Sequence, residues 1–249
     1  QLPARVLREV YAHARSGYPE EVCGLLVGAR ESGALPLSPD QRERLFQRAS
    51  LIGRSDDWSL AAVEGARELE LKNLLSGLSL WFSYELMDDT GFVPTYFEAR
   101  FGGQLRAGDD PDLSIEEGVA LDVGGTTALL FGGKIDRIDV TQDGSRARVI
   151  DYKTGKQQSK GGKILDRGRR LQLPVYLLAT ERMLRARDAN ATVETAEYLY
   201  VSSHEAPSSM AFTRHELERA SEDLATAIGL IVPGITSGMF ITYPPAGAD

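Results

Sequence analysis

The sequence is poor in the side chains that hold redox-active or soft metals. It has one cysteine, Cys23, and three histidines among 249 residues. A single cysteine excludes an internal disulfide, and it also excludes an iron–sulfur or zinc centre built from several cysteines of the same chain. We therefore expect no iron–sulfur cluster within this chain and a reducing, cytoplasmic setting.

Long apolar runs and a nucleotide-binding loop are also missing. No run approaches the roughly 20 apolar residues that a membrane-spanning helix needs, so we expect no membrane partner. The phosphate-binding pattern G-x-x-x-x-G-K-[ST] does not occur, because Gly133-Lys134 and Gly162-Lys163 are both followed by isoleucine. Any ATP-driven step would have to come from another domain or subunit.

Charge is unevenly distributed along the chain. The formal net charge is −8, which argues against a protein that coats nucleic acid indiscriminately. Residues 151–170 nevertheless carry +5, which leaves −13 for the remainder. Lysines in such a band can follow a phosphate backbone, so we expect Lys156, Lys160 and Lys163 to bind substrate. A solvated loop is the alternative interpretation of the same residues.

The stretch from Phe131 to Gly155 predicts a β-hairpin. Both flanks are rich in β-branched residues, and Asp143-Gly144 is a strong signal for a two-residue turn. A hairpin centred on this turn places Ile138 opposite Val149, Asp139 opposite Arg148, and Asp136 opposite Asp151. The first pair is apolar and the second is oppositely charged, so the register is chemically consistent.

The third pair predicts a hydrolytic metal site. Facing residues on one side of a sheet have Cβ atoms about 5 Å apart, and two carboxylates at that distance repel unless one is protonated or a cation lies between them. Lys153 projects from the same face as Asp151, because side chains alternate along a strand. We expect Asp136, Asp151 and Lys153 to form a catalytic centre that uses a divalent ion. Arg137 and Asp139 point to the opposite face and are predicted to be structural or peripheral.

The order of predicted elements favours an α/β fold. Helices are expected near residues 3–16, 56–87, 170–187 and 214–231, and strands near 93–101 and 196–202 on either side of the hairpin. This order suggests a small mixed β-sheet flanked by helices. We divide the chain into a helical N-terminal extension, 1–54, whose role is unclear, and a domain over 55–249.

Three consecutive motifs support a family resemblance. GGKIDRID, VIDYKTG and LQLPVY resemble the ordered motifs of RecB-like nucleases in the PD-(D/E)XK superfamily, most closely over residues 131–179. The resemblance implies a restriction-endonuclease-like core and a Mg²⁺-dependent deoxyribonuclease that also tolerates Mn²⁺. It further implies an exonuclease-type processor of DNA ends in recombination and repair, working with a helicase domain or subunit and leaving 5′-phosphate and 3′-hydroxyl products.

The resemblance also assigns roles to individual residues. It implies that Asp136 and Asp151 bind the metal together with the backbone carbonyl of Tyr152, and that Lys153 is the lysine of the motif. Gln172 and Tyr176, four residues apart on one helix face, would line the site or contact substrate.

Two further residues have open interpretations. Glu98 matches an acidic position found before the metal hairpin in many relatives, so it is either a further metal ligand or a solvent-facing strand residue. RecB-like nucleases often have a histidine ligand on an early helix, and His13 is the sole upstream candidate. The sequence around His13 does not match that motif, so we expect a surface or packed histidine.

Alternatives to a DNA exonuclease stay open. A catalytically inactive DNA-binding or scaffolding module could keep the nuclease fold, although it would not need the two acids and the lysine. RNA as substrate, endonucleolytic cleavage and a CRISPR-associated role are also compatible with the sequence, and strand polarity is not predicted.

Overall fold

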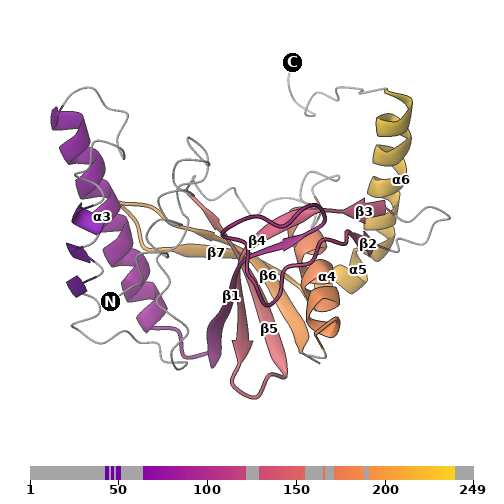
Figure 1. The fold of residues 1–249 in the computed structure, drawn as a ribbon, viewed down its shortest axis with the longest axis horizontal. Helices are drawn as coiled ribbons and strands as arrows, with labels where there is room; N and C mark the ends of the chain where they lie inside the picture. Colours follow the sequence, from indigo (N-terminus) through magenta and orange to yellow (C-terminus); the bar gives the residue numbers. More distant parts are fainter. Residues whose placement is uncertain are drawn as a thin grey trace.

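The computed structural model describes residues 43–51 apart from 45 and 48, together with 64–121, 129–154, 165, 171–187 and 191–238. Its centre is a five-stranded sheet with the strand order β1-β4-β5-β6-β7 (Figure 1). The strands are β1 (Phe92–Phe101), β4 (Gly133–Thr141), β5 (Arg146–Lys153), β6 (Thr192–Tyr200) and β7 (Ser208–Thr213). β5 and β6 are parallel, and every other neighbouring pair is antiparallel. The predicted small mixed sheet is confirmed.

Helices cover both faces of this sheet, as predicted for the α/β class. In Figure 1, α3 lies on one side of the sheet, and α4, α5 and α6 lie on the other. These helices are α3 (Glu64–Leu86), α4 (Gln172–Arg185), α5 (Arg214–Arg219) and α6 (Ser221–Ser237). A separate two-stranded sheet, β2 (Val119–Leu121) with β3 (Leu129–Phe131), was not predicted.

The β4–β5 hairpin has the predicted register but a longer loop. Ile138 pairs with Val149 and Asp139 with Arg148, as expected. The loop, however, comprises residues 142–145 and not two residues. Oδ1 of Asp143 accepts hydrogen bonds from Thr141 Oγ1 at 2.6 Å and from the Ser145 N–H at 3.0 Å, and these local bonds replace the last rung of the ladder. Because one residue leaves each strand, the register is unchanged.

Alternation along β4 and β5 separates two groups of side chains. Ile138 and Val149 join the main apolar core, which also includes Leu173, Leu177 and Met183 of α4. On the opposite face, Ile150 and Tyr152 pack with Leu199, Trp81 and Tyr84, so the C-terminal part of α3 covers that face. Asp136 and Asp151 belong to the face covered by α4.

Helix α3 runs through Gly65 and Gly77 without a break. Gly77 lies at a close approach, since a Cβ there would lie 3.2 Å from the Ser202 carbonyl oxygen and the neighbouring backbone would have to shift by a few tenths of an ångström. Beside it, Ser76 Oγ donates to the Ser203 carbonyl at 2.7 Å. The helix is thereby fixed to the segment that follows β6.

The predicted helix over 214–231 is wrong in its continuity. A capping box of Thr213 and Glu216 begins α5, which ends at Arg219, and α6 then begins at Ser221. The predicted helix over 3–16, the N-terminal residues to 42 and positions 56–63 lie outside the described residues. Within the described part of the chain, no helix is long and apolar enough to cross a membrane.

Candidate active site

Two carboxylates lie at the end of the β4–β5 pairing, on the face covered by α4. The last paired residues are Arg137 and Ile150, and Asp136 and Asp151 occupy the next position on each strand. Burial and then the negative charge of Asp151 raise the pKa of Asp136 to about 7. The Tyr152 backbone N–H donates to Asp136 Oδ2 at 2.9 Å and partly opposes this rise. Without a cation, Asp136 therefore holds its proton for a substantial fraction of the time at neutral pH.

Lys153 lies beside Asp151 and is accessible from outside. Its Nζ forms an ion pair with Asp151 Oδ2, and 36% of the lysine side chain is exposed against 4% for the aspartate. The same Nζ lies 5.1 Å from the centre of the Tyr198 ring, within cation–π range. Tyr198 is the direct neighbour of Asp151 in the parallel pairing of β5 with β6. The ammonium is thus held between a buried acid and an aromatic ring.

Gln172, the first residue of α4, connects these groups. Its Nε2 donates to Asp151 Oδ1 at 3.1 Å and to the Tyr176 hydroxyl at 3.0 Å, while its Oε1 accepts from the Tyr198 hydroxyl at 3.0 Å. An ionised carboxylate only accepts hydrogen bonds, so the amide has one consistent orientation. The Tyr176 hydroxyl in turn donates to the Lys134 carbonyl at 2.8 Å. Gln172 therefore contacts Asp151 directly, and Tyr176 is connected to that carboxylate through Gln172.

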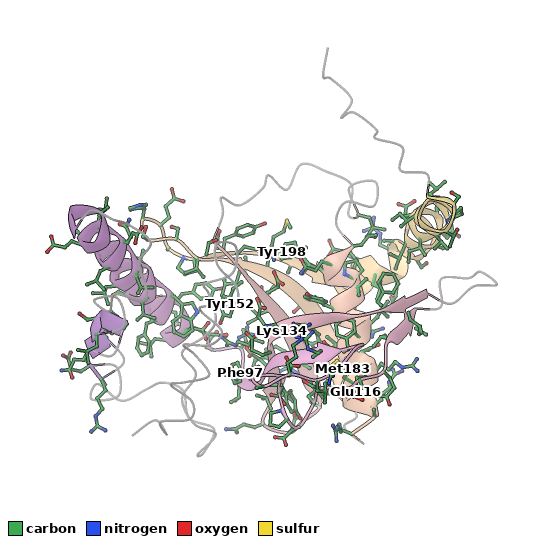
Figure 2. All side chains as sticks on the ribbon, turned by 45° about the horizontal axis from the view of Figure 1, so that its top comes forward. Phe97, Glu116, Lys134, Tyr152, Met183 and Tyr198 are labelled. Carbon is green, nitrogen blue, oxygen red and sulfur yellow. The ribbon has the colours of Figure 1, made fainter. Side chains whose placement is uncertain are left out.

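Figure 2 shows Lys134, Tyr152 and Tyr198, which come from the three adjacent strands β4, β5 and β6. Sequence reasoning missed Tyr198. Its position follows from the pairing of β6 with β5, which joins residues far apart in the chain. The predicted strand over 196–202 contained the residue, but nothing local indicated which strand it would join.

Glu98 on β1 lies opposite Asp136. Its neighbours Phe97 and Ala99 pair with Arg137 and Ile135, which bracket that position. The negative charge of Glu98 contributes to the raised pKa of Asp136, after burial and Asp151. The glutamate forms an ion pair with Lys134, and its side chain is only 17% exposed. The solvent-facing interpretation is therefore wrong.

Glu98 also has an unusual backbone. Its φ is 54°, the one positive φ of a non-glycine residue among those described. Such a conformation costs on the order of 1–3 kcal/mol and persists where surrounding contacts fix it. Here the Asp110 N–H donates to the Glu98 carbonyl at 3.1 Å, and Asp110 Oδ2 accepts from the Phe97 N–H at 3.0 Å. The connector after β1 thus holds the glutamate beside the acid pair.

The donor set suits a hard divalent cation. Within a strand, the N–H and C=O of one residue point to the same side, so the Tyr152 carbonyl lies on the β4 side, like the N–H that bonds Asp136. Two carboxylates and a carbonyl supply only oxygen, which Mg²⁺ prefers. Within the described ranges, no group of three or more His, Cys, Asp or Glu side chains is placed to hold a metal ion. An ion here would keep several water ligands, as Mg²⁺ commonly does.

Four predicted residues cannot be placed. Lys156, Lys160 and Lys163 lie between the described residues 154 and 165, and His13 lies before the described part of the chain. Their suggested roles stay predictions.

Comparison with known proteins agrees with this geometry. The model of the PD-(D/E)XK nuclease superfamily matches residues 8–243. A subunit of the ATP-dependent helicase/deoxyribonuclease from Clostridium tetani is 41% identical over 88 residues, which are 34% of this chain and 7% of that protein. The subunit of the same name from Acetivibrio thermocellus is 33% identical over 114 residues, 45% of this chain and 9% of that protein.

The matches to the two relatives are short, whereas the family match is long. The matched segments make up less than a tenth of either relative, at 7% and 9% of their lengths. The family match extends over 8–243 and so includes most of the predicted extension as well, while the division at residue 55 stays a prediction. This chain belongs to the PD-(D/E)XK nuclease superfamily.

Proposed function

We propose that this chain is a metal-dependent deoxyribonuclease that hydrolyses phosphodiester bonds. The observation that carries the proposal is the meeting of Asp136 and Asp151 on one face of the sheet, with Lys153 paired to Asp151. Membership of a nuclease superfamily supports the reaction class. The names of the two relatives support DNA as the substrate.

In this proposal, Asp136, Asp151 and the Tyr152 carbonyl hold Mg²⁺, with Mn²⁺ as a substitute. A bound divalent ion would stabilise charge on the scissile phosphate and lower the pKa of the attacking water. The protein supplies the orientation of the ligands. Gln172 fixes one oxygen of Asp151 by its hydrogen bond, and such outer contacts commonly determine metal affinity.

Lys153 has the role of a charged donor at the reacting phosphate. Its ammonium is partly exposed and next to the acid pair, so it can orient the attacking water or offset the charge that develops in the transition state. Glu98 either contributes a further ligand or tunes Asp136 by its charge. Lys156, Lys160 and Lys163 would follow the DNA backbone beyond the site.

We further propose an exonuclease-type role at DNA ends in recombination or repair, next to a helicase domain or subunit, in the cytoplasm. The support is the combined helicase and deoxyribonuclease name of both relatives. The second candidate is an inactive module that binds DNA or serves as a scaffold. The complete set of two acids and a lysine argues against that candidate, because a site without activity has no need for this arrangement.

Cleavage of end-labelled single- and double-stranded DNA with Mg²⁺, Mn²⁺ or EDTA tests the proposal. We expect cleavage with either ion, none with EDTA, and loss of cleavage but not of DNA binding in Asp151→Asn. Asp143→Asn is the matched control, because it makes the same chemical change at the exposed tip of the same hairpin. A wild-type protein that binds DNA but does not cleave it under any of these conditions would favour the inactive module.

A further inference from the structure

A buried charge network lies on the face of the sheet opposite the proposed site. Arg137 is 2% exposed and Asp139 is 0% exposed. Nε and Nη2 of Arg137 donate to the two carboxylate oxygens of Asp139 at 2.6 and 2.8 Å. Nη1 donates to Glu85 of α3 and to the Tyr152 hydroxyl, both at 2.9 Å. Arg148 Nε also donates to Asp139, at 2.9 Å.

Stability alone is a weak explanation for this network. Removing charges from water is costly, and apolar residues of similar volume often replace a buried ion network with no loss of stability. Unlike apolar packing, however, the network makes a directional hydrogen bond to one side chain of the β4–β5 hairpin. That side chain is Tyr152.

Tyr152 has contacts on both faces of the sheet. Its hydroxyl accepts from Arg137 on the network side, and its ring packs against Ile150 and Leu199. Its backbone N–H donates to Asp136 on the other side of the sheet. The peptide groups of Tyr152 also connect Asp151 to Lys153 along the chain. A shift of the tyrosine ring would therefore move the backbone that joins all three site residues.

We propose that Arg137 and Asp139 are positioning residues, which act on the nuclease site through the Tyr152 hydroxyl although they touch neither metal nor DNA. The inference rests on the proposed function, because it takes the acid pair and the Tyr152 carbonyl as the ligand set. Through Glu85, the last turn of α3 belongs to the same network. The position of α3 should therefore influence the geometry of the nuclease site, although the helix does not contact that site.

Tyr152→Phe is the sharpest test, because it deletes one hydroxyl and keeps the buried ring. Changing groups that orient metal ligands typically costs ten- to a hundredfold in affinity or activity. We expect the Mg²⁺ concentration for half-maximal cleavage to rise about tenfold. The rate at saturating Mg²⁺ should fall much less, and DNA binding in EDTA should not change. Arg137→Lys should shift the metal requirement in the same direction, because one ammonium cannot reproduce the fork that reaches both Asp139 and Tyr152.

Ile150→Val is the matched control for general destabilisation. It lies on the same strand and face, two residues before Tyr152, and belongs to the same apolar cluster. We expect it to lower the melting temperature without changing the Mg²⁺ requirement. An unchanged requirement in both Tyr152→Phe and Arg137→Lys would overturn the positioning role. So would an equal increase in Ile150→Val.

Direct Mn²⁺ binding, measured by electron paramagnetic resonance without DNA, separates this inference from the proposed function. We expect wild type to bind, Tyr152→Phe to bind about tenfold more weakly, and Asp151→Asn to lose the site. If wild type binds Mn²⁺ but cleaves nothing, the nuclease proposal fails, and the affinity of Tyr152→Phe still decides the positioning role. A wild type that binds no Mn²⁺ overturns both.

Discussion

Tyr198 is joined to Asp151 by a single glutamine, whose amide accepts from the tyrosine hydroxyl and donates to the carboxylate. The two residues are also neighbours across β5 and β6. The carboxylate sets which way the amide faces, since a flipped Gln172 would turn its oxygen toward an anion, and the Tyr198 hydroxyl holds the amide oxygen in that orientation.

Tyr198→Phe should therefore weaken catalysis without unfolding the protein. The variant keeps the ring over which the Lys153 ammonium lies but frees the Gln172 amide. We expect a loss of about tenfold in cleavage at fixed Mg²⁺, with a change in melting temperature of only a few degrees. A matched substitution, Tyr200→Phe on the same strand, should have a much smaller effect on cleavage. Equal effects of the two variants would contradict the role given to Tyr198.

Lys153→Ala should reduce cleavage strongly. Removing a charged donor at a reacting phosphate typically lowers the rate by about a hundredfold or more. Binding of end-labelled DNA in EDTA should weaken only slightly, because one lysine contributes little to the total electrostatic attraction. Lys72→Ala is the control, since Lys72 is an exposed lysine of α3, outside the proposed site. Retention of normal cleavage by purified Lys153→Ala would exclude the lysine from the mechanism.

Metal binding should depend on pH through Asp136. Burial and the nearby Asp151 raise the pKa of this carboxyl from its ordinary 3.8 to about 7, and a ligand must be ionised. Mg²⁺ affinity should thus fall up to about tenfold for each pH unit below 7 and level off above it. Calorimetric titration at pH 6, 7 and 8 measures this, and below pH 7 a proton should be released for each ion bound.

The stability of the metal-free protein should change in the opposite direction. A folded-state pKa above the unfolded value gives stability that is fully present below pH 3.8 and is lost as pH rises through about 7. Thermal unfolding in EDTA should therefore show a lower melting temperature at pH 8 than at pH 6, and Asp136→Asn should reduce that difference. The assignment would be contradicted if the melting temperature of the metal-free wild type changed between pH 6 and pH 8 by the same amount as that of Asp136→Asn.

Glycine should be better tolerated than alanine at position 98. Both substitutions remove the carboxylate, but only alanine keeps the cost of a positive φ, which is 54° here. We expect Glu98→Gly to be more stable than Glu98→Ala by about 1 kcal/mol, measured by denaturant unfolding. In an ordinary strand interior, the alanine variant would be the more stable of the two. A more stable Glu98→Ala would therefore contradict the left-handed conformation.

Much of the fold could be predicted because its signals are local. The strand expected over 93–101 is β1 (Phe92–Phe101), and the helix expected over 170–187 contains α4 (Gln172–Arg185). β7 was missed, since Ser208–Thr213 has only two strongly apolar inward positions, Met210 and Phe212. The break between α5 and α6 was missed as well, although Ser221 followed by two acidic residues is itself a helix-start signal.

The site shows the same division between local and tertiary information. Asp136 and Asp151 could be brought together from the hairpin alone, because its turn fixes the register. The contact of Tyr198 with Gln172 depends on how β6 and α4 pack against β5, and no short-range pattern encodes that packing. The left-handed backbone of Glu98 depends on Asp110, which lies in a connector with no regular pattern.

The tip of the β4–β5 hairpin is a suitable position for attaching a reporter group. Residues 142–145 are exposed, while Asp136 and Asp151 lie five residues or more from the loop ends Thr141 and Arg146. At about 3.3 Å per residue, the tip is roughly 15 Å or more from the acids. A fluorophore or a short affinity tag attached at Gln142 should therefore report on DNA engagement in single-molecule assays while leaving turnover intact.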